Sequence, residues 1–399
     1  MLRKGLPLEA ALDSASRGLD RPDDRAFAHA ITAEALRRLP DLDALIDSAT
    51  KQRLPEDAKA RFVLRIALVQ ALALSTPPHA AISTALPLVD GGPRRLVHGV
   101  FGALMRRGAT LPDVPTLPAT IARRWRDNWG DEAAAAAARL LAIQAPLDLS
   151  FPPGKPPDLD GIALMPDHLR LPTRTAVAGL TGYGEGKWWV QDVAASIPAR
   201  LLGTGDGRTA LDLCAAPGGK TMQLAAAGFR VTAVDASESR LARLSENLAR
   251  TGLGAEIAQG DVLAWTPAEA ADAILLDAPC SATGIFRRHP DVLHRFRPKA
   301  LAGLADVQAQ MLARAADWLR PGGILVYSVC SLEPEEGEHV ADRFLSSRCD
   351  YAADPVQPGE LAPQIPLPDG RVRVLPGTFE PEGGADGFFV ARFRRLSRG

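Results

Sequence analysis

The stretch from Ala210 to Thr221 reads ALDLCAAPGGKT: a short apolar run, then small residues, a glycine pair and a lysine. Such a run predicts a buried strand that turns directly into a helix. Gly218 and Gly219 allow a ligand to approach the backbone closely, and the first N–H groups of the following helix are available to bind it. The stretch matches neither GxxxxGK[ST] nor GxGxxG, so it predicts a nucleotide-type cofactor that lacks a pyrophosphate.

Apolar strands alternate with helical segments in the chain that follows this stretch. The alternation indicates an α/β fold with a doubly wound, mostly parallel sheet. Ligands of such sheets bind beyond the carboxyl ends of the strands, so the informative residues should follow each strand. The predicted strands are Ala210–Leu213, Val231–Val234, Ala273–Leu276 and Ile324–Val329, and the predicted helices are Thr221–Ala227, Glu238–Arg250 and Leu301–Trp318.

Aspartates stand at the ends of these strands. Asp235 closes the second strand, where a carboxylate can accept hydrogen bonds from both hydroxyls of a ribose. Asp261 closes a third strand, where an acceptor could meet an adenine amino group, and Asp277 closes the next. Each aspartate alone is more often a turn or cap residue. Together with Asp212, they place four carboxylates beside one Gly-rich loop, which fits S-adenosyl-L-methionine (AdoMet) in a class I methyltransferase.

Two of the four cysteines, Cys280 and Cys330, also follow strand ends. Cysteine is often only a small buried apolar residue, which is what we expect of Cys214 and Cys349. A thiolate that adds to C6 of a pyrimidine makes C5 nucleophilic, so two cysteines near a methyl donor suggest covalent catalysis. We also expect a helix over Glu333–Leu345, whose N-terminus would lower the pKa of the Cys330 thiol.

A basic loop follows Cys280, where residues 283–291 read TGIFRRHPD. The adjacent arginines, Arg287 and Arg288, suit the backbone of a single-stranded or flipped-out nucleic acid. Elsewhere in a chain the same residues would indicate only an exposed basic loop. Next to Cys280 they are candidate RNA contacts.

The first part of the chain is basic and reads as all-helical. Residues 1–130 hold 19 Lys and Arg against 14 Asp and Glu, although the whole chain has a net charge of −1. Arginine clusters at residues 37–38, 94–95, 106–107 and 123–126 are either phosphate contacts or ordinary surface charge, and the sequence leaves both interpretations open. Apolar positions at three-to-four spacing predict the helices Leu8–Ser16, Arg25–Leu39, Leu42–Lys51, Ala58–Leu74, Arg95–Arg107 and Ile121–Gln144.

Composition limits the class of protein. With 399 residues, 46% hydrophobic and 23% charged, the chain is typical of a globular protein of two or three domains. The cysteines lack the paired spacing of a zinc site, so we expect no metal. The longest apolar stretch, Phe62–Leu74, contains Arg65 and is too short to span a bilayer. We therefore expect a cytoplasmic monomer that does not bind membranes.

Residues 188–395 resemble the RNA cytosine-C5 methyltransferases of the Sun/Fmu/Nop2 group. The resemblance rests on CAAPGGKT from Cys214, on DAPCS from Asp277, on GIFRRHPD from Gly284, and on YSVCSLEPEE from Tyr327. The first 125 residues resemble the NusB-like helical RNA-binding domain, most visibly in Pro78–Ile82 and Val97–Val100. A NusB-like region before this catalytic domain is the arrangement of the RsmB/Sun (Fmu) family, which acts on 16S rRNA.

The resemblance implies a NusB-like helical domain over residues 1–125 and a methyltransferase domain with a seven-stranded sheet over 201–399. Between them, a Pro-rich stretch and short strand-like pieces predict a small α/β connector over 126–200. It implies AdoMet as the cofactor, RNA as the partner, and C5 of a cytosine, most often in 16S rRNA, as the methyl acceptor. The residues that it implies for cofactor binding are Cys214, Ala215, Ala216, Pro217, Gly218, Gly219, Lys220, Asp235, Asp261 and Asp277.

The same resemblance assigns roles to the cysteines. Cys330 is implied as the nucleophile and Cys280 as the residue that assists release, a division we favour although DNA cytosine-C5 enzymes use the cysteine of a Pro-Cys motif. Asp277 is expected to position the cytosine or handle its proton. His294 stands where many relatives carry lysine.

Other functions stay open at this point. One is a NusB-type RNA-binding or transcription factor whose methyltransferase domain is inactive, and another is the same chemistry on tRNA. An NAD-dependent oxidoreductase on a similar sheet is disfavoured by the missing GxGxxG.

Overall fold

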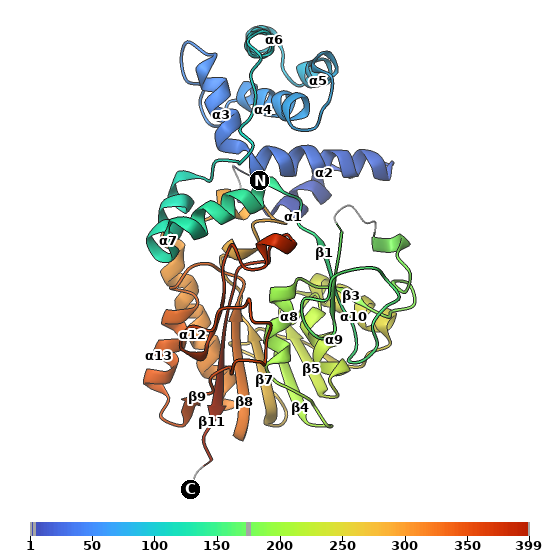
Figure 1. The fold of residues 1–399 in the computed structure, drawn as a ribbon, viewed down its shortest axis with the longest axis vertical. Coiled ribbons are helices and arrows are strands. Elements are labelled where there is room, and N and C mark those ends of the chain that lie inside the picture. Colours follow the sequence, from blue (N-terminus) through green and yellow to red (C-terminus); the bar gives the residue numbers. More distant parts are fainter. Residues whose placement is uncertain (1, 3–4, 173–176, 398–399) are drawn as a thin grey trace. The chain divides into compact units, whose positions relative to one another are not determined.

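The computed structural model describes residue 2, residues 5–172 and residues 177–397. The chain packs as two compact units, which Figure 1 colours along the sequence. The helical unit consists of Met1–Ile143 and Phe286–Phe296, and the α/β unit consists of Gln144–Ile285 and Arg297–Gly399. Among the described residues, no helix has both the length and the apolar character needed to cross a membrane.

The helical unit confirms the predicted all-helical region. Pro22, Pro40 and Pro78 stand in the first turns of their helices, where a missing N–H costs no hydrogen bond. The predicted boundary at residue 125 falls inside the last helix, which is interrupted only at Gly130, where φ is 85°. The helices are α1 (Leu8–Ala15), α2 (Pro22–Arg37), α3 (Leu39–Ser48), α4 (Lys59–Leu72), α5 (Pro78–Ala85), α6 (Gly91–Arg106) and α7 (Ala119–Ala142).

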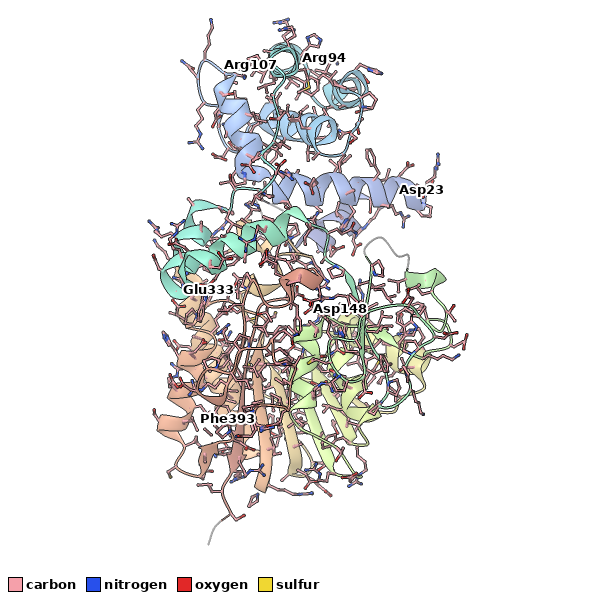
Figure 2. All side chains as sticks on the ribbon, viewed as in Figure 1. Asp23, Arg94, Arg107, Asp148, Glu333 and Phe393 are labelled. Atoms are coloured by element: carbon pink, nitrogen blue, oxygen red, sulfur yellow. The ribbon has the colours of Figure 1, made fainter. Side chains whose placement is uncertain are left out.

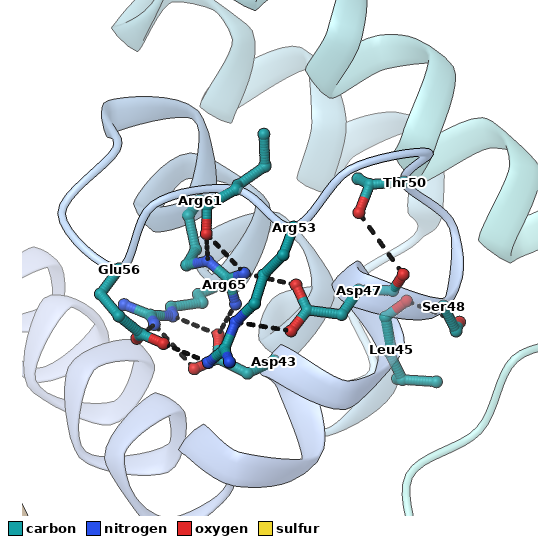
Figure 3. Close-up of polar contacts among 10 residues, drawn as sticks. Asp43, Leu45, Asp47, Ser48, Thr50, Arg53, Glu56, Arg61 and Arg65 are labelled. Atoms are coloured by element: carbon teal, nitrogen blue, oxygen red, sulfur yellow. Dashed lines mark hydrogen bonds and ion pairs between the residues drawn. The ribbon is translucent and has the colours of Figure 1, made fainter.

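Buried ion pairs join α3 to α4 in the helical unit. Arg65 binds both oxygens of Asp43 at 2.7 Å, and Arg61 Nη1 lies 3.0 Å from Asp43 Oδ1. Both arginines are buried, so these charges need their partners. Figure 3 shows that Asp47, Arg53 and Glu56 complete the network. Its charges are matched, so the network stabilises the helix pair rather than offering free charge to a ligand.

The segment Phe286–Phe296 belongs to the helical unit although it lies far along the chain from α1–α7. The Phe286 and Trp125 rings pack with their centroids 5.3 Å apart. Asp291 Oδ2 accepts a hydrogen bond from Leu8 N at 3.2 Å. The segment that follows the Cys280 loop is therefore built into the packing of the helical unit.

A mixed sheet of eight strands forms the core of the α/β unit, in the order β10-β11-β8-β7-β4-β5-β6 with β9 paired to β11. Strands β4 to β8 pair in parallel, and β9, β10 and β11 pair antiparallel. The α/β class is confirmed, and β9 adds one strand to the predicted seven. The strands are β4 (Thr209–Leu213), β5 (Arg230–Asp235), β6 (Glu256–Gln259), β7 (Ala271–Asp277), β8 (Leu319–Val329), β9 (Tyr351–Ala353), β10 (Val372–Val374) and β11 (Phe388–Arg395).

Alternate side chains of the central strands face two helix layers. In β7, Ile274 and Leu276 pack with α12 (Leu301–Asp317) and α13 (Glu338–Ser347), whereas Ala273 and Leu275 pack with α8 (Val193–Arg200) and α9 (Gly219–Ala226). Helix α10 (Glu238–Thr251) packs against α9. Figure 1 shows the two layers on opposite sides of the sheet. Burial on both faces explains why these strands read as continuous apolar runs.

The helix expected over Glu333–Leu345 begins later than predicted. Helix α13 starts at Glu338, and loop and turn structure occupies residues 331–337. The predicted helix start at Glu333 is therefore wrong, and the N-terminus of α13 lies eight residues along the chain from Cys330.

A small antiparallel sheet precedes the large one in the α/β unit. Strand β1 (Leu147–Ser150) lies between β2 (His168–Leu171) and β3 (Trp189–Val190). Arg170 donates to both oxygens of Asp148, at 2.6 and 2.7 Å, and both residues are buried. Burial raises the pKa of Asp148, but the hydrogen bonds and positive charges of Arg170 and His168 together outweigh burial and hold the pKa well below its usual range.

Candidate active site at the carboxyl edge of the sheet

The Gly-rich stretch forms a tight loop between β4 and α9, as predicted. Gly218 has a φ of 103°, and a Cβ there would lie 3.0 Å from Leu244 Cγ, so glycine is needed for both reasons. Asn247 Nδ2 donates to Pro217 O at 3.0 Å, which ties the loop to α10. The positive φ of Gly218 and the hydrogen bond from Asn247 together restrict the backbone of this loop.

Asp212, near the end of β4, is fully buried. Thr221 Oγ1 donates to its Oδ2 at 2.6 Å, whereas its Oδ1 has no hydrogen-bond partner in the described part of the chain. Burial raises the pKa of Asp212 to about 7, and the bond from Thr221 offsets only part of this rise. A buried acceptor without a partner beside a Gly-rich loop would be satisfied by a donor on a bound ligand.

Asp235 and Asp261 stand at the carboxyl ends of β5 and β6, where the sequence places them. Asp235 is buried, and its oxygens accept hydrogen bonds from Ala216 N at 3.2 Å and Ser237 N at 2.9 Å. Each carboxylate oxygen has two lone pairs, so these bonds orient Asp235 and leave acceptor capacity for a ligand. Asp261 is exposed, and its Oδ1 accepts from Leu263 N at 2.9 Å.

Asp277, at the end of β7, has a partner on each oxygen. Lys220 Nζ lies 2.8 Å from Oδ2, and Ser328 Oγ donates to Oδ1 at 2.8 Å. Burial opposes the positive charge of Lys220, but the charge and hydrogen bond of Asp277, together with smaller effects of Asp212 and Cys330, outweigh burial and raise the pKa of Lys220. Since Lys220 directly follows Gly219, the ion pair brings a fixed positive charge from the Gly-rich loop to the cysteine side of the edge.

The structure brings the two predicted thiols together. Cys280 Sγ and Cys330 Sγ are 3.5 Å apart, within hydrogen-bond distance for sulfur, because β7 and β8 are parallel neighbours that end at the same edge. The hydrogen bond with Cys330, followed by burial, raises the pKa of Cys280 well above its usual range. Cys280 therefore keeps its proton at neutral pH and can donate it in a hydrogen bond to the Cys330 sulfur.

The remaining cysteines lack this environment. Burial raises the pKa of Cys214 to about 12, and the negative charges of Asp277 and Asp235 add to the rise, which fits the inert role expected of it. Cys349 is exposed in the turn before β9, so the expectation that it is buried is wrong. Among the described residues, no group of three or more His, Cys, Asp or Glu could hold a metal ion.

The two predicted RNA contacts, Arg287 and Arg288, belong to the helical unit rather than to this edge. Arg287 is only 1% exposed, and its burial argues against a direct contact with RNA in this conformation, whereas Arg288 is partly exposed. His294 Nε2 lies 2.7 Å from Leu36 O. The residue that stands in place of the lysine of many relatives therefore makes a packing contact within the helical unit.

Sequence reasoning missed Glu336, a buried carboxylate that binds the residue after each cysteine. Ser281 N donates to it at 2.8 Å and Ser331 Oγ at 2.6 Å. The available signal was the Cys-Ser pair that occurs twice, followed by an acidic run after the second pair. The acidic run also fits a helix start, so the sequence pattern gives no indication that Glu336 contacts Ser281 of the first Cys-Ser pair.

Both parts of the chain match protein-family models. Residues 199–394 match the model of 16S rRNA methyltransferase RsmB/F, and residues 2–105 match the model of the NusB family. The Ribosomal RNA small subunit methyltransferase B of Xanthomonas campestris pv. campestris is 32% identical over 422 aligned residues, which cover 99% of this chain and 94% of the relative.

Solved structures agree with the fold. The crystal structure of PH0851 has a TM-score of 0.75, with 22% identity, over 94% of this chain and 91% of its own. The methyltransferase homolog protein from Pyrococcus horikoshii has a TM-score of 0.57, with 26% identity, over 74% of this chain and 98% of its own. Since the likeness to the Xanthomonas protein extends over nearly all of both sequences, the chain belongs to the RsmB/F family of 16S rRNA methyltransferases.

Proposed function

We propose that this protein methylates C5 of a cytosine in 16S rRNA, with AdoMet as the methyl donor and Cys330 as a covalent nucleophile. The observation that carries the proposal is the 3.5 Å separation of the Cys280 and Cys330 sulfurs at the edge that also holds the Lys220–Asp277 pair. Methyl transfer to C5 needs a thiolate at C6 and further groups that manage the proton and the release. Two thiols and an ion pair at one edge meet both needs.

The residues around the Gly-rich loop fit AdoMet. Cys214–Lys220 would approach the cofactor through backbone, Asp235 would accept the ribose hydroxyls, and Asp261 would meet the adenine amino group. Asp212 Oδ1, buried without a partner in the described structure, would accept a hydrogen bond from a donor of the cofactor. AdoMet supplies an electrophilic methyl group carried on a sulfonium.

The chain's own residues carry the covalent chemistry. The Cys330 thiolate forms a C–S bond at C6 of the cytosine, which breaks the C5–C6 double bond and leaves its electrons in an enamine that is nucleophilic at C5. The Cys280 S–H and the Lys220 ammonium stabilise this thiolate before attack. Once C5 carries the methyl group, loss of the C5 proton to a base re-forms the C5–C6 double bond and expels the Cys330 thiolate. Cys280 assists this release, and Asp277 orients the cytosine.

We assign the RNA surface of the helical unit to α6. This helix exposes Arg94, Arg95 and Arg106, and Arg107 follows at its end. No Asp or Glu occurs between residues 91 and 112, and none of these arginines pairs with a carboxylate in the described structure. Arg94 lies near the start of the helix and Arg107 follows its last residue; both are labelled in Figure 2. These two uncompensated pairs of guanidinium groups fit contacts with separate phosphates of an RNA backbone.

Several members of the other arginine clusters pair with carboxylates of the protein. Arg37 and Arg38 both pair with Glu34 and are mostly buried. Arg126 pairs with Asp131 at 2.7 Å. These pairings leave α6 as the cluster best suited to RNA.

The experiment combines bisulfite sequencing of 16S rRNA with a search for covalent protein–RNA complexes on denaturing gels. Cys330→Ala is expected to abolish methylation while AdoMet still binds, and Cys280→Ala to accumulate the covalent complex. Cys349→Ala, an exposed cysteine, is the matched control and should behave as the unmodified protein. Exchanged phenotypes would reverse the two roles. Failure to bind AdoMet in calorimetry would instead indicate a NusB-type factor, and methylation confined to tRNA would reject the substrate.

A further inference from the structure

Glu336 is fully buried in the α/β unit, and its carboxylate is filled with hydrogen-bond donors. Oε1 accepts from Ser281 N at 2.8 Å and from Gln308 Nε2 at 3.0 Å. Oε2 accepts from Ser281 Oγ at 2.5 Å and from Ser331 Oγ at 2.6 Å. A carboxylate offers about four acceptor sites, so the four donors saturate it.

The donors come from the two loops that carry the thiols. Ser281 directly follows Cys280, and Ser331 directly follows Cys330. The two serine hydroxyls are also 3.1 Å from each other. One side chain therefore links the residues next to both sulfurs, and Gln308 anchors it to α12.

We propose that Glu336 is a positioning residue, which holds the Cys280 and Cys330 loops in the alignment that places the two thiols side by side. The proposal rests on the proposed cysteine chemistry, because that chemistry requires Cys280 to lie beside Cys330 while Cys330 attacks the base. Displacement of a reacting group by about 1 Å can cost about 10²-fold in rate. The carboxylate also contributes to the raised pKa of Cys280, after the Cys330 hydrogen bond and burial, and so helps to keep that thiol protonated.

The rate at which Cys280 and Cys330 form a disulfide measures how well the two thiols are aligned, and this measurement needs neither RNA nor AdoMet. Diamide takes two electrons and two protons from the thiols, an S–S bond forms, and the N=N bond of the reagent is reduced. Mass spectrometry of the peptides that contain Cys280 and Cys330 follows this pair specifically. The rate of closure depends on how often the sulfurs meet.

Two substitutions of Glu336 that both remove its charge distinguish the effect of its hydrogen bonds on the alignment of the thiols from the effect of its negative charge. Glu336→Gln and Glu336→Ala both remove the negative charge, but the amide can still accept from Ser281 N and Gln308 and donate to the serine oxygens, which can act as acceptors. We expect closure in Glu336→Gln within about threefold of the unmodified protein, and at least tenfold slower closure in Glu336→Ala. Methyl transfer should follow the same order in kcat, with AdoMet affinity unchanged. Glu246→Ala, at an exposed position of α10, is the control.

The outcomes separate this proposal from the proposed function. Equal closure rates in folded Glu336→Gln and Glu336→Ala would overturn the positioning role. If Glu336→Ala does not fold, Ser281→Ala and Ser331→Ala each remove one hydroxyl link and are expected to slow closure, and normal closure in both would overturn it as well. If disulfide closure is slow in Glu336→Ala but the unmodified protein does not methylate cytosine, the positioning role would be supported and the proposed function rejected.

Discussion

Lys220 and Asp277 form a 2.8 Å ion pair that joins the loop after β4 to the end of β7. Their side chains are 12% and 26% exposed, so solvent screens the pair less than it screens a surface pair. The pair therefore holds the Lys220 ammonium at the edge of the sheet at which Cys330 lies.

Removing the lysine should slow attack by the thiolate. In Lys220→Met, Cys330 loses a neighbouring positive charge and Asp277 loses its counter-ion, so we expect kcat to fall at least about tenfold and the rising limb of the pH profile to move to higher pH. Single-turnover methyl transfer between pH 6 and 10 measures both effects. Lys187→Met, which breaks the exposed pair with Glu185, is the control. An unchanged pH profile in Lys220→Met would show that this ammonium does not act on the thiolate.

Stability should fall with rising pH because of Asp212. The pKa of this carboxyl is about 7 in the folded chain and 3.8 in the absence of the fold, so the folded protein holds the extra proton between these values. The contribution to stability is complete below pH 3.8 and is lost as pH rises through 7, about 2–3 kcal/mol between pH 5 and pH 8. Urea unfolding of the AdoMet-free protein should show this decline, and Asp212→Asn should flatten it. The control variant Asp261→Asn should show the same decline in stability as the unmodified protein. An equal decline in Asp212→Asn would exclude Asp212 as its source.

The buried pair Asp148–Arg170 should be costly to break from one side. Arg170→Met leaves a buried carboxylate without its partner, so we expect a loss of about 3–5 kcal/mol in the free energy of unfolding. The double variant Asp148→Asn with Arg170→Met should lose less than the sum of the single variants. Arg320→Met breaks a pair with Asp272 that is partly exposed, and should cost below about 1 kcal/mol. Additive losses at Asp148 and Arg170 would argue against direct coupling.

The α6 arginines should control the salt dependence of RNA binding. Replacing Arg94, Arg95 and Arg106 by Gln, one at a time, should weaken binding and reduce the slope of log K against log[salt] by about 0.7–0.9 each. Fluorescence anisotropy with a 16S rRNA fragment at several salt concentrations measures the slope. Arg53→Gln removes an arginine that pairs with Glu56 in the network of Figure 3, and should leave the slope unchanged. Equal slopes in all variants would place the RNA on another surface.

Sequence patterns predicted the features that one local rule decides. The strand–loop–helix around Gly218, and the carboxylates at the strand ends, follow from alternating parallel strands, since all of these strands end at one edge. The proximity of Cys280 and Cys330 follows from the same rule, because their strands are neighbours in the sheet.

Features that depend on contacts between distant segments escaped the prediction. Acidic residues after Cys330 favour a helix N-terminus locally, but Glu336 is instead bound by Ser281 and Gln308, which belong to other segments. Cys349 was expected in a core because of its residue type, and the turn in which it lies leaves it exposed. Local patterns do not encode which segments meet.

Because Phe286–Phe296 belongs to the helical unit, that unit cannot complete its folding until this late segment has been synthesised. A ribosome releases α1–α7 first, when Trp125 and Leu8 N still lack the partners that Phe286 and Asp291 provide. Those partners emerge only after β4–β7 have been translated. The helical unit therefore stays incompletely packed until a segment from the second half of the chain has been synthesised. The two units then complete their folding together rather than one after the other.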